Sequence, residues 1–213
     1  MPREGKHDRF GRLVCESLKP HLGEAYHYTG APHHGFRRER PFGHESVMVH
    51  LWGKYAPHRH LEFMLGVWHE KYEAVRLRLG LEPTLAGADH FWQTTFNLRG
   101  HWPIPGTHSG RWDANLDENP SALAPEIVPF LNDAIHAVFG TCADLRKVRG
   151  LLLQGFNGPL WTSDPWQQIA LIDAALSDWP HLTGFIKRTD LPFSGSKDMN
   201  LVKGIQDAFG FEY

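Results

Sequence analysis

Two imidazoles and a carboxylate occupy alternate positions in one short segment of the chain. His58, His60 and Glu62 are each separated by a single residue, and alternate residues of a β-strand project to the same face. Imidazole and carboxylate groups that converge on one point are common ligands of Zn²⁺. One interpretation is therefore a metal-dependent hydrolase centred on these three residues. The other is a strand face without a metal, because a chain with 15 His contains such spacings by chance.

Neighbouring segments add aromatic and polar side chains to the same side of a predicted sheet. If segments 46–53, 60–68 and 91–98 are strands of one sheet, one face gathers His50, Trp52, His60, Glu62, Trp68, Gln93 and Asn97. Trp and His combine a large contact area with polar groups, which suits the recognition of a ligand or partner. We predict that this set is a binding surface, and call it the predicted recognition face. The alternative is that C-terminal helices pack on it and bury the Trp side chains.

Other motifs in the chain do not complete a catalytic or metal-binding pattern. The spacing of Asp113, Asn115 and Asp117 resembles a calcium loop, but Glu118 stands where that loop needs Gly. The chain contains no Gly-x-Ser-x-Gly sequence, and Cys15 and Cys142 lie outside any known motif. We therefore assign no catalytic residue, no cofactor and no metal ligand in the leading interpretation.

The elements that must position these residues follow from the hydrophobic periodicity. Apolar residues alternate in the predicted strands and leave a core-facing set: Val47, Val49, Leu51, Leu61, Phe63, Leu65, Val67, Trp92, Phe96 and Leu98. Helical spacing of apolar residues predicts helices over 7–21, 68–79, 125–139, 165–178 and 196–209. The basic clusters 37–40 and 146–149 are interpreted as solvated loops. Strands that precede a helical second half indicate an α+β fold.

Composition limits the classes of function. The 213 residues carry 22 Lys and Arg against 24 Asp and Glu, a net charge of −2, which argues against general binding to nucleic acid or to a membrane surface. No apolar run approaches the ~20 residues of a membrane span, and the first residues lack the apolar segment of a signal peptide. We therefore expect a cytoplasmic protein whose partner is another protein or a small ligand.

The order of several short motifs resembles the bacterial Domain of Unknown Function 4304 family. The matching pieces lie within about residues 7–140: Leu18-Lys-Pro20, Gly35-Phe36-Arg37, Phe63-Met-Leu-Gly-Val67, Arg76-Leu-Arg-Leu-Gly80, Asp89-His-Phe-Trp92 and Pro129-Phe-Leu131. The Gln-Lys-Ser that usually follows the first long strand is replaced by Leu51-Trp-Gly-Lys54. The resemblance implies bacterial origin and no particular activity, so it adds no catalytic residue.

Together these patterns predict one α+β domain over 1–213. Residues 1 to about 120 would form an N-terminal helix and an antiparallel sheet, and about 121–213 a helical part packed on it. The leading functional hypothesis is a non-enzymatic binding or interaction protein of the bacterial cytoplasm that uses the predicted recognition face. The alternative is the metal-dependent hydrolase with His58, His60 and Glu62 at its centre.

Overall fold

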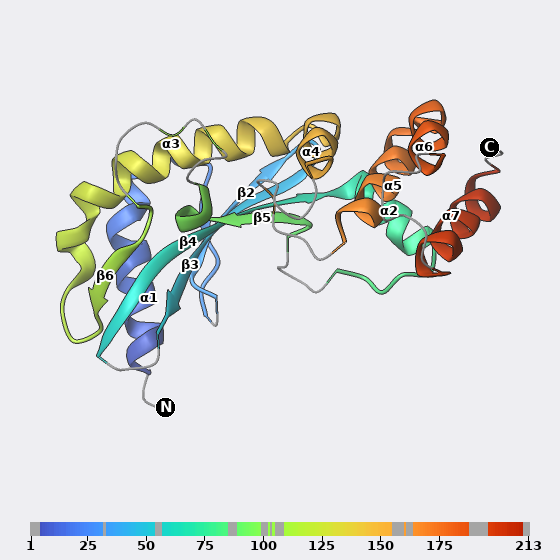
Figure 1. Ribbon diagram of the computed structural model, residues 1–213. Coiled ribbons are helices and arrows are strands. Elements are labelled where there is room, and N and C mark those ends of the chain that lie inside the picture. Colours follow the sequence, from blue (N-terminus) through green and yellow to red (C-terminus); the bar gives the residue numbers. More distant parts are fainter. Residues whose placement is uncertain are drawn as a thin grey trace.

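A computed structural model of the chain confirms the α+β class (Figure 1). The structure describes residues 5–31, 33–53, 57–84, 89–98, 102, 104, 109–154, 160, 164–187 and 196–210. The α-helices are α1 (Lys6–Leu18), α2 (Glu70–Arg78), α3 (Ala124–Cys142), α4 (Leu145–Leu152), α5 (Pro165–Leu176), α6 (Trp179–Ile186) and α7 (Ser196–Phe209). Short 3₁₀ helices span Lys19–His21, Thr95–Leu98 and Pro120–Leu123.

The sheet is antiparallel and has a long central hairpin. Its strands are β1 (His27–Tyr28), β2 (Gly35–Arg40), β3 (Gly43–Trp52), β4 (His58–His69), β5 (Phe91–Thr94) and β6 (Trp112–Asn115). The order is β1-β2-β3-β4-β5, and β6 pairs with the first part of β4, on the residues that precede those paired with β5. The predicted antiparallel sheet is confirmed. The basic cluster 37–40 lies in β2, so its interpretation as a solvated loop is wrong.

The register of the central hairpin separates an apolar face from a polar one. Val47 lies opposite Leu65, and Val49 lies opposite Phe63. Leu61, Phe63, Leu65 and Val67 are all 0% exposed, so the apolar face of β4 is the core side that the alternation predicts. The other side, which we call the polar face, consists of residues 44, 46, 48, 50 and 52 of β3 and 60, 62, 64, 66 and 68 of β4.

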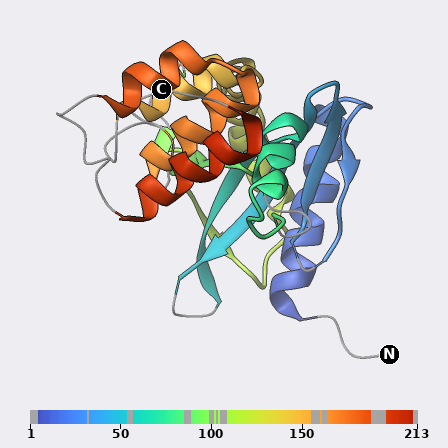
Figure 2. The same ribbon diagram turned by 90° about the vertical axis from the view of Figure 1, so that its right-hand side faces the viewer.

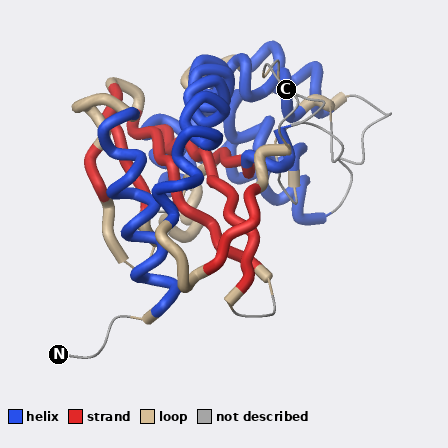
Figure 3. The backbone as a smooth tube through the Cα atoms, turned by 90° about the vertical axis from the view of Figure 1, so that its left-hand side faces the viewer, coloured by secondary structure: helices blue, strands red, loops and turns tan. Residues whose placement is uncertain are grey.

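Helices α1 and α3 cover the apolar face. Helix α1 buries Phe10, Val14 and Leu18 in the same hydrophobic cluster as the strands, and Figures 2 and 3 show it running alongside the sheet. From α3, the ring of Phe130 meets Trp112 of β6 edge-on at 5.7 Å between centroids. Trp112 in turn meets Phe63 at 5.8 Å, which joins helix, edge strand and central strand in one core.

The remaining helices gather where β4 runs into α2. Figure 1 places α4 to α7 at this end of the sheet, and α5 packs against both α2 and α4. They therefore do not form a layer over the open end of the polar face, around Trp52 and His60. Trp52 there is 38% exposed, so the C-terminal helices do not bury this Trp side chain of the predicted recognition face.

Two helices lie where the sequence pattern predicted none. Helix α4 contains the basic cluster 146–149, and it begins after Asp144, whose side chain accepts a hydrogen bond from the backbone N–H of Arg146 at 2.9 Å. Helix α6 begins at Trp179, with Pro180 in its first turn. Proline at that position lacks only an N–H that would have no partner within the helix. The Trp179-Pro180 pair can therefore start a helix.

Candidate functional site

The polar face brings four of the predicted residues together at its open end. Trp52 lies opposite His60, and His50 lies opposite Glu62. The Trp52 and His60 rings are 4.9 Å apart between centroids. Trp52 is 38% exposed and Glu62 only 3%, so an exposed aromatic ring covers a buried carboxylate.

Arg111, just before β6, completes this arrangement. Its Nε donates to Glu62 Oε1 at 2.7 Å, and Trp52 Nε1 donates to the same oxygen at 2.6 Å. The Arg111 guanidinium carbon lies 4.3 Å from the centre of the Trp52 ring, in cation–π geometry. Together Trp52, His60, Glu62 and Arg111 form what we call the Trp52 cluster. Its shared carboxylate holds both the indole and the guanidinium in place, so the exposed ring is preorganised.

A cavity of about 580 Å³ opens beside this cluster. It is lined by Gly53, His58, Arg59, His60, Asp113, Ala114, Asn115 and Glu118. The pairing of β6 with β4 sets His58 opposite Asn115 and His60 opposite Asp113, and His60 Nδ1 lies 3.1 Å from Asp113 Oδ1. Pockets for small molecules commonly measure about 300–1,000 Å³, so this cavity is large enough to hold one.

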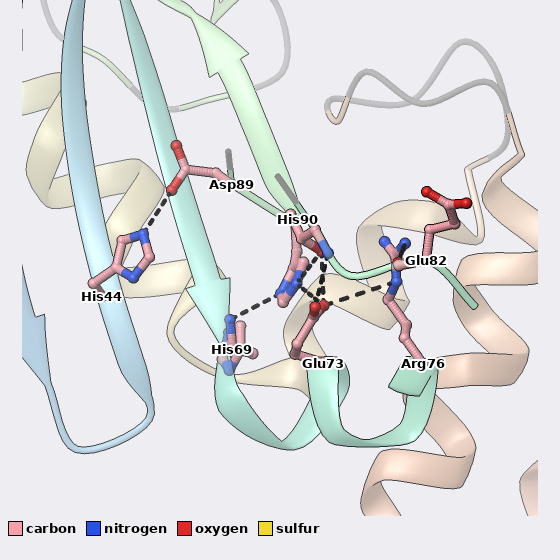
Figure 4. A network of polar contacts seen from close by, with 8 residues as sticks. His44, His69, Glu73, Arg76, Glu82, Asp89 and His90 are labelled. Carbon is pink, nitrogen blue, oxygen red and sulfur yellow. Dashed lines mark hydrogen bonds and ion pairs between the residues drawn. The ribbon is translucent and has the colours of Figure 1, made fainter. Parts of the chain in front are cut away.

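The other end of the polar face carries a second polar group around Asp89. The Asp89 side chain is 0% exposed, and Oδ1 lies 3.4 Å from His44 Nε2 (Figure 4). Ser46 donates its hydroxyl to the other carboxylate oxygen. Gly66 leaves the space for this carboxylate, since a Cβ there would lie 2.0 Å from Asp89 Oδ2. Trp68, a predicted face residue, is at this end and stacks on His44 at 5.4 Å.

A third polar group belongs to the junction of β4, α2 and β5 and has a structural role. His90 Nδ1 accepts from the backbone N–H of His69 at 3.0 Å, and His90 Nε2 donates to Glu73 Oε2 at 2.9 Å (Figure 4). Burial lowers the pKa of His90 to about 4, although Glu73 opposes this shift. A neutral imidazole with both nitrogens engaged has no free position for a ligand or a proton transfer.

Two predicted face residues are elsewhere. Gln93 is opposite Leu65 on the apolar side and is 3% exposed, so its placement on the polar face was wrong. The strand ends at Thr94, and Asn97 lies in the following 3₁₀ helix with an exposed side chain. The register of β5 explains why Gln93 is on the apolar side. Trp92 lies opposite Gly66 and Thr94 lies opposite Met64, so these two residues take the polar side.

His58, His60 and Glu62 do not form the alternative metal centre. Within the described ranges, no group of three or more His, Cys, Asp and Glu side chains is placed to hold a metal ion. Glu62 Oε1 instead accepts hydrogen bonds from Trp52 and Arg111. The described geometry therefore adds no support to the hydrolase hypothesis.

Several residues of these groups had not been predicted. His44 could have been found, because it shares the strand parity of His50 and Trp52. Asp89 was noted only as a neighbour of His90. Nothing in the local sequence indicated Arg111, which reaches Glu62 across 49 residues of chain.

Comparisons with known proteins returned no match. No family model, curated protein or solved structure matched the chain. In the described part of the chain, every helix is too short or too polar to cross a bilayer.

Proposed function

We propose that the protein is a non-enzymatic binding protein, and that its ligand is a small polar molecule held beside the Trp52 cluster. The observation that carries the proposal is the position of His60, which lines the 580 Å³ cavity and lies 4.9 Å from the half-exposed Trp52 ring between centroids. Helices α1 and α3 pack on the opposite face of the sheet, and α4 to α7 lie at its other end, so this end stays open. Recognition sites commonly combine an aromatic contact surface with a few fixed polar groups.

The cavity lining indicates the chemistry of such a ligand. The hydrogen-bond donors in the lining come from His58, Arg59 and His60. The acceptors come from Asp113 and Glu118. A ligand that carries both kinds of group satisfies this lining better than an apolar one, because polar groups that lose water need new partners. The Trp52 ring provides the flat surface against which an unsaturated or ring-shaped part of the ligand would stack.

The wider setting is also part of the proposal. We propose a bacterial protein of the cytoplasm that resembles the Domain of Unknown Function 4304 family and uses neither nucleic acid nor a cofactor. The support is the motif order described above and the net charge of −2.

Ligand-observed NMR with a pool of small polar metabolites tests the proposed function. The double variant Trp52→Ala with His60→Ala should weaken the binding of a hit at least tenfold. The matched control is Leu77→Ala with His136→Ala, which removes an exposed apolar side chain and an exposed imidazole from helices. This control should bind as the unchanged protein does.

A second variant separates loss of binding from loss of folding. His58→Ala changes an exposed lining residue and should weaken the same hit without shifting the melting temperature. The proposal fails if no compound in the pool binds the Trp52/His60 variant more weakly than it binds the control variant.

A further inference from the structure

A second cavity, of about 620 Å³, lies where the sheet meets the helices of the second half. Its lining comes from four segments: 40–42 at the turn between β2 and β3, 69–71 where β4 runs into α2, 143–146 between α3 and α4, and Leu176 at the end of α5. None of these residues lines the cavity beside the Trp52 cluster. The size falls within the ~300–1,000 Å³ that is common for small-molecule pockets.

Charged side chains of both signs line this second cavity. Those of Glu70, Lys71 and Arg146 are exposed and have no hydrogen bond or ion pair among the residues described. Asp144, the N-terminal cap of α4, uses Oδ1 to accept from the backbone N–H of Arg146 at 2.9 Å. The third cation of the lining, Arg40, instead pairs with a buried carboxylate of β3. A cation and a carboxylate therefore border the cavity at the start of α2, and another such set borders it at the start of α4.

The rest of the wall is largely apolar and fixed in position. Phe42, Leu145 and Leu176 contribute large apolar side chains. The Phe42 ring stacks on His69 at 4.8 Å between centroids. His69 is 3% exposed, and its Nε2 lies 2.7 Å from the carbonyl oxygen of Cys142. Burial lowers the pKa of His69, so this ring adds no charge to the wall at neutral pH.

We infer that this second cavity binds a small zwitterion with an apolar side chain, either a free amino acid or a dipeptide. The Arg146 guanidinium provides the paired donors that match the ligand's carboxylate, and the carboxylates of Glu70 and Asp144 accept from its ammonium group. Its apolar side chain packs on the Phe42 ring. A ligand with one sign of charge would leave the opposite groups without partners after they lose water. The inference goes beyond the proposed function and does not depend on it.

Calorimetric titration with phenylalanine and with the dipeptide leucyl-phenylalanine tests the inference. The unchanged protein should bind at least one of them saturably. Binding of phenylalanine assigns a free amino acid, and binding of the dipeptide alone assigns a peptide. N-acetylation removes the positive charge of the ligand, and amidation of its carboxylate removes the negative one. Either change should weaken binding at least tenfold. A blocked ligand that binds as tightly as the unblocked one would overturn the inference, because only one sign of charge would then be recognised.

Variants of exposed residues locate the site. Arg146→Gln should weaken binding at least tenfold and should remove most of the difference between the ligand and its amide, since Arg146 recognises the carboxylate. Lys147→Gln is the matched control, because Lys147 is an exposed cation of the same helix outside the lining. It should change the affinity less than twofold. Trp52→Ala with His60→Ala should leave binding unchanged, which keeps this site distinct from the proposed function. Failure of both ligands to bind, or equal effects of Arg146→Gln and Lys147→Gln, would overturn the inference.

Discussion

At the scale of single residues, the face of the sheet on which a side chain lies decides whether it belongs to the core: Phe63 on the apolar face is 0% exposed, and Trp52 on the polar face is 38% exposed. In β3 and β4 a long run of alternating residues fixes which side chains face the core. In β5 only four residues are in the strand, too few for alternation to show its register. Phe91 and Gln93 face the core, and Gln93 is accommodated because its Oε1 accepts from the backbone N–H of Thr94 at 2.9 Å.

The same alternation gives a direct test of the two faces. Phe63→Ala should lower the free energy of unfolding by about 3–5 kcal/mol, since a fully buried aromatic ring leaves a cavity. His60→Ala should lower it by less than about 1 kcal/mol, because its ring lies on the open face. Urea unfolding curves of both variants check this expectation. Equal losses would contradict the assignment of the faces.

At the scale of elements, short helices were the hardest to predict. The basic residues 146–149 fit a solvated loop as well as a helix when read without their neighbours. In the structure, Arg149 faces inward, and its Nη1 donates to Asp178 Oδ2 at 2.8 Å. Asp178 also accepts from the backbone N–H of His181 at the start of α6. Such a helix depends on capping groups and on long-range contacts, which apolar periodicity alone does not reveal.

The junction of β4, α2 and β5 should make the fold sensitive to acid. Burial lowers the pKa of His90 from 6.5 to about 4, so the unfolded chain binds a proton more readily than the folded one. Stability is then complete above pH 6.5 and falls as the pH drops toward 4, by roughly 3 kcal/mol in total. Burial raises the pKa of Glu73, but hydrogen bonds from Thr84 and His90 lower it overall. Its protonation therefore destabilises the fold in the same direction.

Unfolding free energies measured between pH 4 and pH 7.5 test this dependence. His90→Gln should reduce the slope over that range, since the side chain no longer takes up a proton on unfolding. His136→Gln, at an exposed position of α3, should keep the slope. The burial that lowers the pKa of His69 should leave part of the dependence in the His90 variant. An unchanged slope in His90→Gln would rule out His90 as a source of the dependence.

At the scale of the whole molecule, one hydrophobic cluster connects both halves of the chain. It includes Phe10 of α1, Leu65 of β4, Ile169 of α5 and Ile205 of α7. The α+β class and the helical second half could be predicted because long apolar periods determine them. The packing positions of α4 to α7 could not be predicted, because their apolar stripes fit any apolar surface. Their position beside α2 leaves the open end of the polar face free, where His60 lines the 580 Å³ cavity.

A single core implies that the chain unfolds as one unit, and Arg149→Met tests this. Arg149 pairs with the fully buried Asp173, which also lies 2.7 Å from His181 Nδ1. Loss of the guanidinium leaves a buried carboxylate with one partner fewer, so stability should fall by about 3 kcal/mol. Arg146→Met, exposed on the same helix, should change stability by less than about 0.5 kcal/mol. In amide hydrogen exchange, Arg149→Met should lower the protection of the slowest amides of β4 and of α5 by the same free energy. Faster exchange confined to α4 through α6 would instead show that the helical end unfolds separately, and would divide the predicted single domain in two.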